Sequence, residues 1–273
     1  MYRKFSLTLI TFFTLFCSTS AFDNRISGAR SAALGNATVA DSHPESLFIN
    51  TAGSAFLHRV TALVAYESKY AVKEYSLMSA GVLIPARQTG NWGFSVYQFG
   101  TGVYREYKLG LMYARTFGPK WAAGLKFNRM SVMFPENVSQ AKTFAIEGGL
   151  IYRSSERLHL GVHLFNLLNS QYDMPGGKIP LPWSFRIGES WYISDGLRWS
   201  VEFWKVRNHP CSLKSGLEFM PQPGFYLRSG FSGRPFYPCF GMGVIVSRIV
   251  VDMSFHYHEN LGYSPVVSLN YSL

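Results

Sequence analysis

The chain has 273 residues and a formal net charge of +10 at pH 7, with 15% charged and 16% aromatic residues. One barrel can take up this length as a single domain. Because average soluble proteins are nearer a quarter charged, the low share of charged residues favours a protein that is partly solvated by lipid. The basic residues are scattered singly and form no run of five or more, which argues against a nucleic-acid-binding protein.

Residues 1–21 have the features of a secretory signal peptide. Two basic residues precede an apolar run that ends at Cys17, and small residues follow up to Ala21. We expect cleavage after Ala21, which removes the two basic residues and lowers the formal charge from +10 to +8. Lipidation of Cys17 is an alternative, but Phe16 stands where a lipoprotein signal has a small residue.

Beyond residue 21, large apolar residues alternate with small or polar ones almost continuously from Leu57 onward. No stretch there has the eighteen apolar residues of a membrane helix, so we expect any membrane crossing to use strands. In 120–127, for example, Leu125 and Phe127 share one face while Lys126 lies on the other. This period of two, with large apolar residues outside, is typical of membrane barrel strands.

The alternation and the turn signals predict an all-β fold, a transmembrane antiparallel β-barrel of about 14 strands. The expected strands are 57–68, 74–87, 90–100, 103–117, 120–134, 142–154, 156–168, 181–194, 196–208, 211–221, 224–232, 237–248, 249–258 and 264–273. Short turns should alternate with longer outer loops, of which 169–182 is the longest. A soluble β-sandwich is the competing fold, but Trp, Phe and Tyr occupy the apolar faces of most strands.

Two cysteines remain after cleavage of the signal peptide, Cys211 and Cys239. In an exported protein they can form a disulfide, and both fall at expected outer loops. A disulfide between them is therefore a prediction.

Residues 28–57 resemble the N-terminal segment of the PorV/PorQ family, relatives of FadL-type outer-membrane transporters. A Gly-Ala-Arg stretch precedes an Asn-Thr-Ala-Gly stretch, where the family has Asn-Pro-Ala-Gly. The residues that carry the match are Gly28, Ala29, Arg30, Gly35, Asn50 and Gly53. Gly28 and Gly35 are no phosphate-binding loop, because the Gly-Lys-Ser or Gly-Lys-Thr ending is missing. The last strand pair also looks like the family's C-terminal hairpin.

The resemblance implies a short N-terminal hatch, residues 22–56, folded into the lumen of a barrel formed by residues 57–273. It also implies location in the outer membrane of a Gram-negative bacterium, in particular of the Bacteroidota. The family's barrels have fourteen strands, which agrees with the number counted from the alternation.

The inward strand positions place both signs of charge in the lumen. The candidate lumen residues are Lys126, Glu147, His159, His163, Arg186, Arg198, Glu202, Lys214, Glu218, Arg228, Asp252 and His256. His159 and His163 should be roughly 13 Å apart along one strand, too far to share a metal ion. Neither a Gly-x-Ser-x-Gly nor a His-Glu-x-x-His motif occurs, so we expect no enzyme, metal or cofactor.

Two functions follow from the resemblance. The first is a non-catalytic subunit of a protein secretion or outer-membrane assembly machine, similar to type IX secretion. Its partners would be outer-membrane lipid and other outer-membrane proteins or lipoproteins. The alternative is a FadL-like passive transporter of hydrophobic small molecules, which needs an apolar pocket beside the hatch and a lateral gap in the barrel wall. Gly148, Gly149 and Gly161 would permit a kink at such a gap, or they are ordinary small inward or tight-packing positions.

Overall fold

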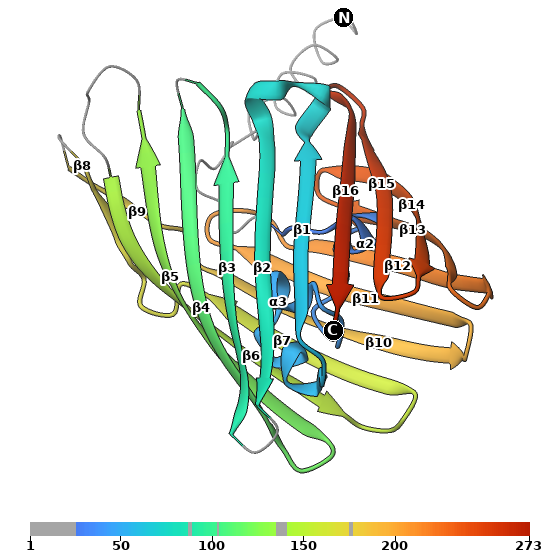
Figure 1. Cartoon of the computed structure of the whole chain (residues 1–273). Coiled ribbons are helices and arrows are strands. Elements are labelled where there is room, and N and C mark those ends of the chain that lie inside the picture. The colour runs from blue at the N-terminus through green and yellow to red at the C-terminus, as the bar shows by residue number, and fades with distance from the viewer. Residues whose placement is uncertain (1–25, 87–88, 103, 135–140, 175–176) are drawn as a thin grey trace, which may run out of the picture.

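The computed structural model describes residues 26–86, 89–102, 104–134, 141–174 and 177–273. The predicted signal peptide and its cleavage site lie outside the described residues. Fourteen of the described strands close into one antiparallel barrel, in which the first strand pairs with the last (Figure 1). The predicted fold class is therefore confirmed.

Each predicted barrel strand corresponds to one strand of the structure. The barrel strands are β1 (Thr61–Ser68), β2 (Ser76–Ala86), β3 (Gly90–Phe99), β4 (Arg105–Phe117), β5 (Trp121–Met133), β6 (Ala141–Arg153), β7 (Leu158–Phe165), β10 (Ser184–Ser194), β11 (Leu197–Val206), β12 (Ser212–Gln222), β13 (Phe225–Gly233), β14 (Phe236–Val246), β15 (Ile249–His258) and β16 (Gly262–Ser272). The first strand begins at Thr61 rather than at residue 57, because a short helix runs up to Phe56. We call the end where β1 meets β2 the outer end, and the opposite end the inner end.

The barrel wall has one apolar and one polar face, as the alternation predicts. On β5, Leu125 and Phe127 are 54% and 59% exposed, whereas Lys126 between them is fully buried. Exposed aromatic residues gather near the inner end, where the Trp121 ring stacks on Tyr152 with centroids 4.3 Å apart. Lipid-facing apolar residues flanked by aromatic residues are the pattern of a membrane-embedded barrel.

The connection between β7 and β10 was predicted as a plain loop, and that prediction is wrong in part. It contains a two-stranded hairpin, β8 (Gln171–Met174) and β9 (Gly177–Pro180). The ladder between β6 and β7 reaches only Glu147, although β6 itself extends outward to Ala141. The hairpin contacts β6 and covers this notch in the wall, because Tyr172 and Leu181 bury their side chains there.

Residues 26–56, the described part of the hatch, lie inside the barrel (Figure 1). They form α2 (Ala29–Ala33), α3 (Ser46–Ile49) and the 3-10 helix η1 (Thr51–Phe56). Two further 3-10 turns, η2 (Lys69–Ala71) and η3 (Lys73–Tyr75), connect β1 to β2. Among the described residues, no helix combines the length and the apolar character needed to cross a membrane.

The predicted disulfide is absent, because both Cys211 and Cys239 are free. Cys211 is exposed just before β12, whereas Cys239 is buried inside the barrel on β14 and not in a loop. Cys239 pairs with Gly230 on β13, and Gly230 pairs with Gly216 on β12. Gly216 follows Cys211 by five residues in the chain. That offset is roughly 17 Å along the strand, far beyond the 4.4–6.8 Å between bonded cysteine Cα atoms.

Candidate functional site at the hatch and the outer cavity

The hatch backbone lies directly against the wall because inward-facing positions of several strands are glycines. A Cβ atom added to Gly124 would lie 2.7 Å from the amide nitrogen of Ala52, and one added to Gly216 would lie 2.6 Å from the carbonyl oxygen of Leu34. The ladder continues on both sides of Gly149 and Gly161, so these inward glycines serve close approach rather than a kink.

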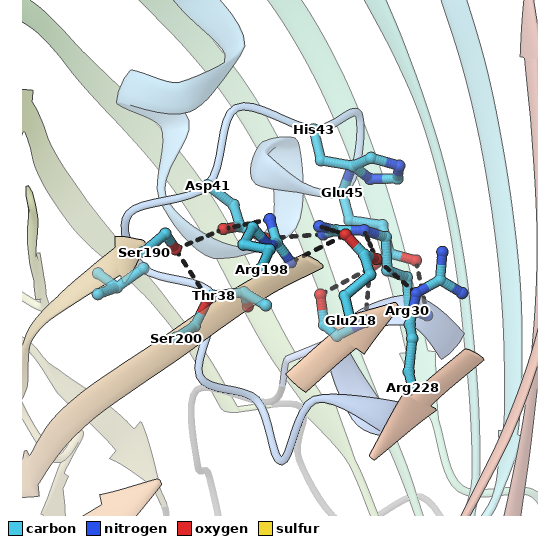
Figure 2. Close-up of polar contacts among 12 residues, drawn as sticks. Arg30, Thr38, Asp41, His43, Glu45, Ser190, Arg198, Ser200, Glu218 and Arg228 are labelled. Carbon is cyan, nitrogen blue, oxygen red and sulfur yellow. Dashed lines mark hydrogen bonds and ion pairs between the residues drawn. The ribbon is translucent and has the colours of Figure 1, made fainter. Parts of the chain in front are cut away.

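An ion-pair network joins the hatch to the strands β11, β12 and β13 (Figure 2). Arg30 contacts Asp41 at 2.7 Å and Glu218 on β12 at 3.0 Å. Arg198 on β11 contacts Asp41 at 2.8 Å, and Arg228 on β13 contacts Glu218 at 2.6 Å. Two hatch residues are thereby linked to three neighbouring strands in a largely buried setting.

Asp41 is the hatch carboxylate at the centre of this network. Burial raises the pKa of Asp41, but the guanidinium groups of Arg198 and Arg30 outweigh burial and hold that pKa below its ordinary value. Asp41 also accepts a hydrogen bond of 2.9 Å from the Ser190 hydroxyl. The carboxylate is therefore ionised and binds hatch and wall together.

Glu202 on β11 forms a second attachment of the hatch. Arg186 on β10 donates two hydrogen bonds to this carboxylate, of 2.6 and 2.8 Å. The amides of Thr38 and Val39 donate to Glu202 at 3.1 and 3.0 Å, and Arg186 also donates to the carbonyl of Asn36 at 3.0 Å. The wall carboxylate thus satisfies buried backbone donors that would otherwise be costly.

Within the hatch, Glu45 and Asn50 fix the chain path. Glu45 accepts hydrogen bonds from the amide and hydroxyl of Ser31, at 2.9 and 2.6 Å. Asn50 donates to the carbonyl of Val39 at 2.6 Å and accepts from the amide of Ala52 at 3.2 Å. The two halves of the hatch are therefore bound to each other.

The opposite side of the hatch packs on apolar residues. Leu47 and Phe48 of α3 belong to a cluster with inward residues of β2, β4 and β5, including Leu83, Met112 and Ala122. Polar contacts are fewer here, although Lys126 donates to the carbonyl of Leu47 at 2.9 Å. We call the side of the lumen at β10 to β15 the charged half and the side at β2 to β6 the apolar half, although the latter also contains the buried Lys108, Lys126 and Glu147.

A small cavity of about 30 Å³ lies at the outer end of the apolar half. Most of its lining is aromatic or apolar. The lining residues are Leu77, Tyr97, Phe99, Glu106, Tyr107, Lys108, Met130 and Tyr172. Phe48 of the hatch packs behind this lining, since the rings of Phe48 and Tyr97 meet edge to face at 5.2 Å. The cavity therefore lies between the hatch and the β8–β9 hairpin.

Lys108 and Glu147 form a charged pair beside this cavity. The Lys108 ammonium lies 2.6 Å from the Glu147 carboxylate. Glu147 also contacts His163 at 3.2 Å and accepts a hydrogen bond of 2.8 Å from Asn128. The charge of Lys108 is thus compensated, and the cavity wall is electrically balanced.

The structure places all twelve predicted lumen residues inside the barrel, and ten of them are buried. Glu218 and His256 keep side-chain exposures of 13% and 15%. The six hatch-motif residues are buried too. His159 lies against the Tyr192 ring, and His163 bonds Glu147, so the two histidines have separate partners. Among the described residues, no group of three His, Cys, Asp or Glu is placed to hold a metal ion.

Several site residues were missed by sequence reasoning. Asp41 and Glu45 are the only carboxylates in the hatch segment 26–56, and that rarity in an otherwise small and apolar stretch was an available signal. Tyr172 was missed because its hairpin was read as a loop. Tyr97 and Phe99 gave no signal, since aromatic residues are frequent on both faces of the strands.

The lumen is filled, the hatch is attached to the wall by buried ion pairs, and the outer surface carries an apolar belt. These features together define a hatch-plugged outer-membrane β-barrel. The toluene transporter TodX of P. putida is similar, with a TM-score of 0.68 at 10% identity over 92% of this chain and 99% of that chain. The Ralstonia pickettii toluene transporter TbuX gives a TM-score of 0.64 at 11% identity, over 93% and 100%. A Pseudomonas aeruginosa FadL homologue gives 0.65 at 10% identity, over 93% and 99%.

At such low identity these likenesses establish the fold, a FadL-type barrel. No family model matches the chain, and no curated protein matches it. The resemblance to the PorV/PorQ family therefore gains no support from the comparisons, whereas the wider FadL-type architecture does.

Proposed function

We propose that the chain is a passive outer-membrane channel for small hydrophobic molecules. The observation that carries the proposal is the cavity lined by Leu77, Tyr97, Phe99, Met130 and Tyr172. Ligand pockets are mostly apolar with a few fixed polar groups, and here Lys108 and Glu106 supply them. The described solved structures that share the fold include two toluene transporters, which supports the same substrate class.

Passage requires movement, because about 30 Å³ holds only a few water molecules and no hydrocarbon ring. The side of the hatch that faces the charged half of the lumen resists movement, since breaking one buried ion pair costs about 3–5 kcal/mol. An apolar side chain such as Leu47 or Phe48 loses roughly 1.5–3 kcal/mol on exposure, and an apolar ligand can replace that contact. The hatch therefore opens along β2 to β6 while its ion pairs stay in place.

Leu77 offers the sharpest test of this path, because it is buried at the cavity while its neighbour Met78 faces lipid. In cells that lack their own FadL-type barrels, Leu77→Trp should fill the cavity and abolish the uptake of radiolabelled toluene that this chain confers. Met78→Trp should leave uptake unchanged. Leu77→Ala should enlarge the cavity and raise toluene binding. Equal uptake by the Leu77→Trp and Met78→Trp variants would contradict the proposal.

The role as a subunit of a secretion or assembly machine is not the one proposed, because the comparisons give the PorV/PorQ resemblance behind it no support. Binding of this chain to other outer-membrane proteins or lipoproteins stays a prediction. Extraction in mild detergent with mass measurement checks it: a stoichiometric outer-membrane partner or lipoprotein would restore the machine hypothesis, and a lone barrel agrees with a channel.

A further inference from the structure

Three basic residues gather on the outward face of the β4–β6 wall near its outer end. They are Arg105, Arg129 and Lys142, and all three are exposed. The register places Arg129 beside outward Leu109 and Phe144. A charged residue on the lipid face costs about 2–4 kcal/mol at the bilayer midplane and close to nothing at the interface. The position of the three basic residues along the membrane normal therefore decides whether they can meet lipid headgroups.

The height of these basic residues in the membrane can be measured from the aromatic residues at the inner end of the same wall. Trp121 on β5 stacks on Tyr152 of β6, and Arg129 lies eight residues farther along β5. Eight residues span roughly 27 Å of strand, or about 20 Å of height at the usual barrel tilt. Lys142 lies ten residues from Tyr152 and is higher still. With an apolar band about 25 Å tall, the backbone of Lys142 lies at the outer headgroups, and that of Arg129 lies about 5 Å lower. The long Arg129 side chain brings its guanidinium to the headgroups from there.

On the side formed by β15 and β16, the outer end of the barrel presents aromatic residues to the membrane. There Tyr257 and Tyr263 face outward with ring centroids 4.8 Å apart, as expected of an interfacial aromatic belt. At the outer end the β4–β6 wall thus presents Arg129 and Lys142 beside Tyr107, whereas the β15–β16 wall presents the two tyrosines.

Two of the three basic residues, Arg129 and Lys142, line a groove of about 330 Å³. Its lining residues are Tyr107, Leu109, Arg129, Ser131 and Lys142. Ser131 pairs with Lys142 across the β5–β6 ladder, which puts Arg129 and Lys142 on diagonal positions about 7–8 Å apart. Neither cation forms an ion pair with another described residue. The spacing leaves room for one phosphate between the two side chains.

We propose that Arg129, Lys142 and the Ser131 hydroxyl bind a phosphate of a phosphorylated glycolipid headgroup in the outer leaflet. The guanidinium supplies two parallel donors to phosphate oxygens, and the ammonium adds a point charge. Acyl chains of the same lipid would lie on Leu111 and Phe127, which pair with each other and face outward below Arg129. This site is on the exterior wall, so it is independent of the channel proposed above.

The test is a lipid titration of the purified, delipidated full chain in detergent, followed by native mass spectrometry. The probes are lipid A with two phosphates, fully dephosphorylated lipid A and inorganic phosphate. Arg129→Gln with Lys142→Gln should lower the affinity for phosphorylated lipid A at least tenfold. The matched control combines Arg115→Gln and Lys120→Gln, which lie at the inner end of the same wall and should change nothing.

Equal loss in the control pair, or no loss in the outer pair, would overturn the proposal. Equal binding of dephosphorylated lipid A would show that phosphate is not recognised. Displacement of the lipid by millimolar inorganic phosphate would show a site for free anions instead of a headgroup. The single variant Lys142→Gln, checked for folding by circular dichroism, distinguishes loss of the binding site from loss of the fold. Toluene uptake by the outer pair should stay normal.

Discussion

Buried charges at the hatch are balanced one against another. Arg30, Arg198 and Arg228 contact Asp41, Glu218 and Asp252, three cations against three carboxylates. Removing one member of such a pair leaves an uncompensated charge out of water, which costs more than the pair itself contributes. The hatch is therefore attached to the wall by charges that are stable only together.

Asp41→Asn tests this attachment. Arg30 and Arg198 would each lose a carboxylate, and a loss of about 3–5 kcal/mol should make hatch opening at least tenfold more frequent. Single-channel recording in planar bilayers measures this frequency. Asp173→Asn is the matched control, because its ion pair with Lys178 is 3.7 Å long and well exposed, and it should leave the recordings unchanged.

Two adjacent glycines on β6 test the close approach of hatch and wall. A Cβ atom at Gly149 would collide with the Asn50 side chain, whereas one at Gly148 would meet the side chains of Leu167 at 3.2 Å and Leu125 at 3.6 Å. Gly149→Ala should displace Asn50 and lower thermal stability by several degrees. Gly148→Ala should leave the melting temperature nearly unchanged. Thermal unfolding followed by heat-modified gel mobility compares them, and identical shifts would argue against a hatch packed on β6.

At the scale of elements, the strands were predictable and the hatch was not. Each strand lies between lipid and a filled lumen, so the period of two is imposed along its whole length, as Leu125, Lys126 and Phe127 show. The hatch depends on contacts that no local pattern records: Arg30 meets Glu218 across 188 positions of sequence. Its small apolar residues indicated burial, but its partners became visible only in the structure.

The β8–β9 hairpin escaped prediction for a different reason. Its strands have four residues each and end beside proline and glycine, so their alternation is too short to stand out. The hairpin holds its place through Tyr172 and Leu181, which pack on Met130, Ala145 and Phe165. It is thus a cover fixed by apolar contacts over the notch between β6 and β7.

Replacing residues 171–180 with a Gly-Ser linker tests this cover. The barrel strands pair without the hairpin, so the variant should fold and reach the membrane. Its outer cavity should open, and an apolar fluorescent probe added from outside should bind more tightly and faster. Lys178→Ala, an exposed change in β9, is the control. Unchanged probe binding after removal of the hairpin would mean that the cavity has another cover.

At the scale of the molecule, the two free cysteines report how the barrel is oriented and whether it is filled. Cys211 lies between β11 and β12 at the outer end, and it is exposed. Cys239 is buried in the lumen, where burial by the hatch and wall shields its thiol. In a barrel with both termini inside the periplasm, Cys211 faces the medium.

With the predicted signal peptide and its Cys17 removed, a bulky maleimide-polyethylene glycol added to intact cells should therefore label one cysteine per chain, and denaturation should expose a second. Cys211→Ser should abolish the first label and Cys239→Ser the second, as read from gel shifts. Without reducing agent the pattern should not change, because the cysteines are unbonded. Labelling of Cys239 in intact cells would mean an open lumen, whereas no label on either cysteine before reduction would mean that they are bonded. The same measurement thus tests the orientation, the filled lumen and the correction of the predicted disulfide.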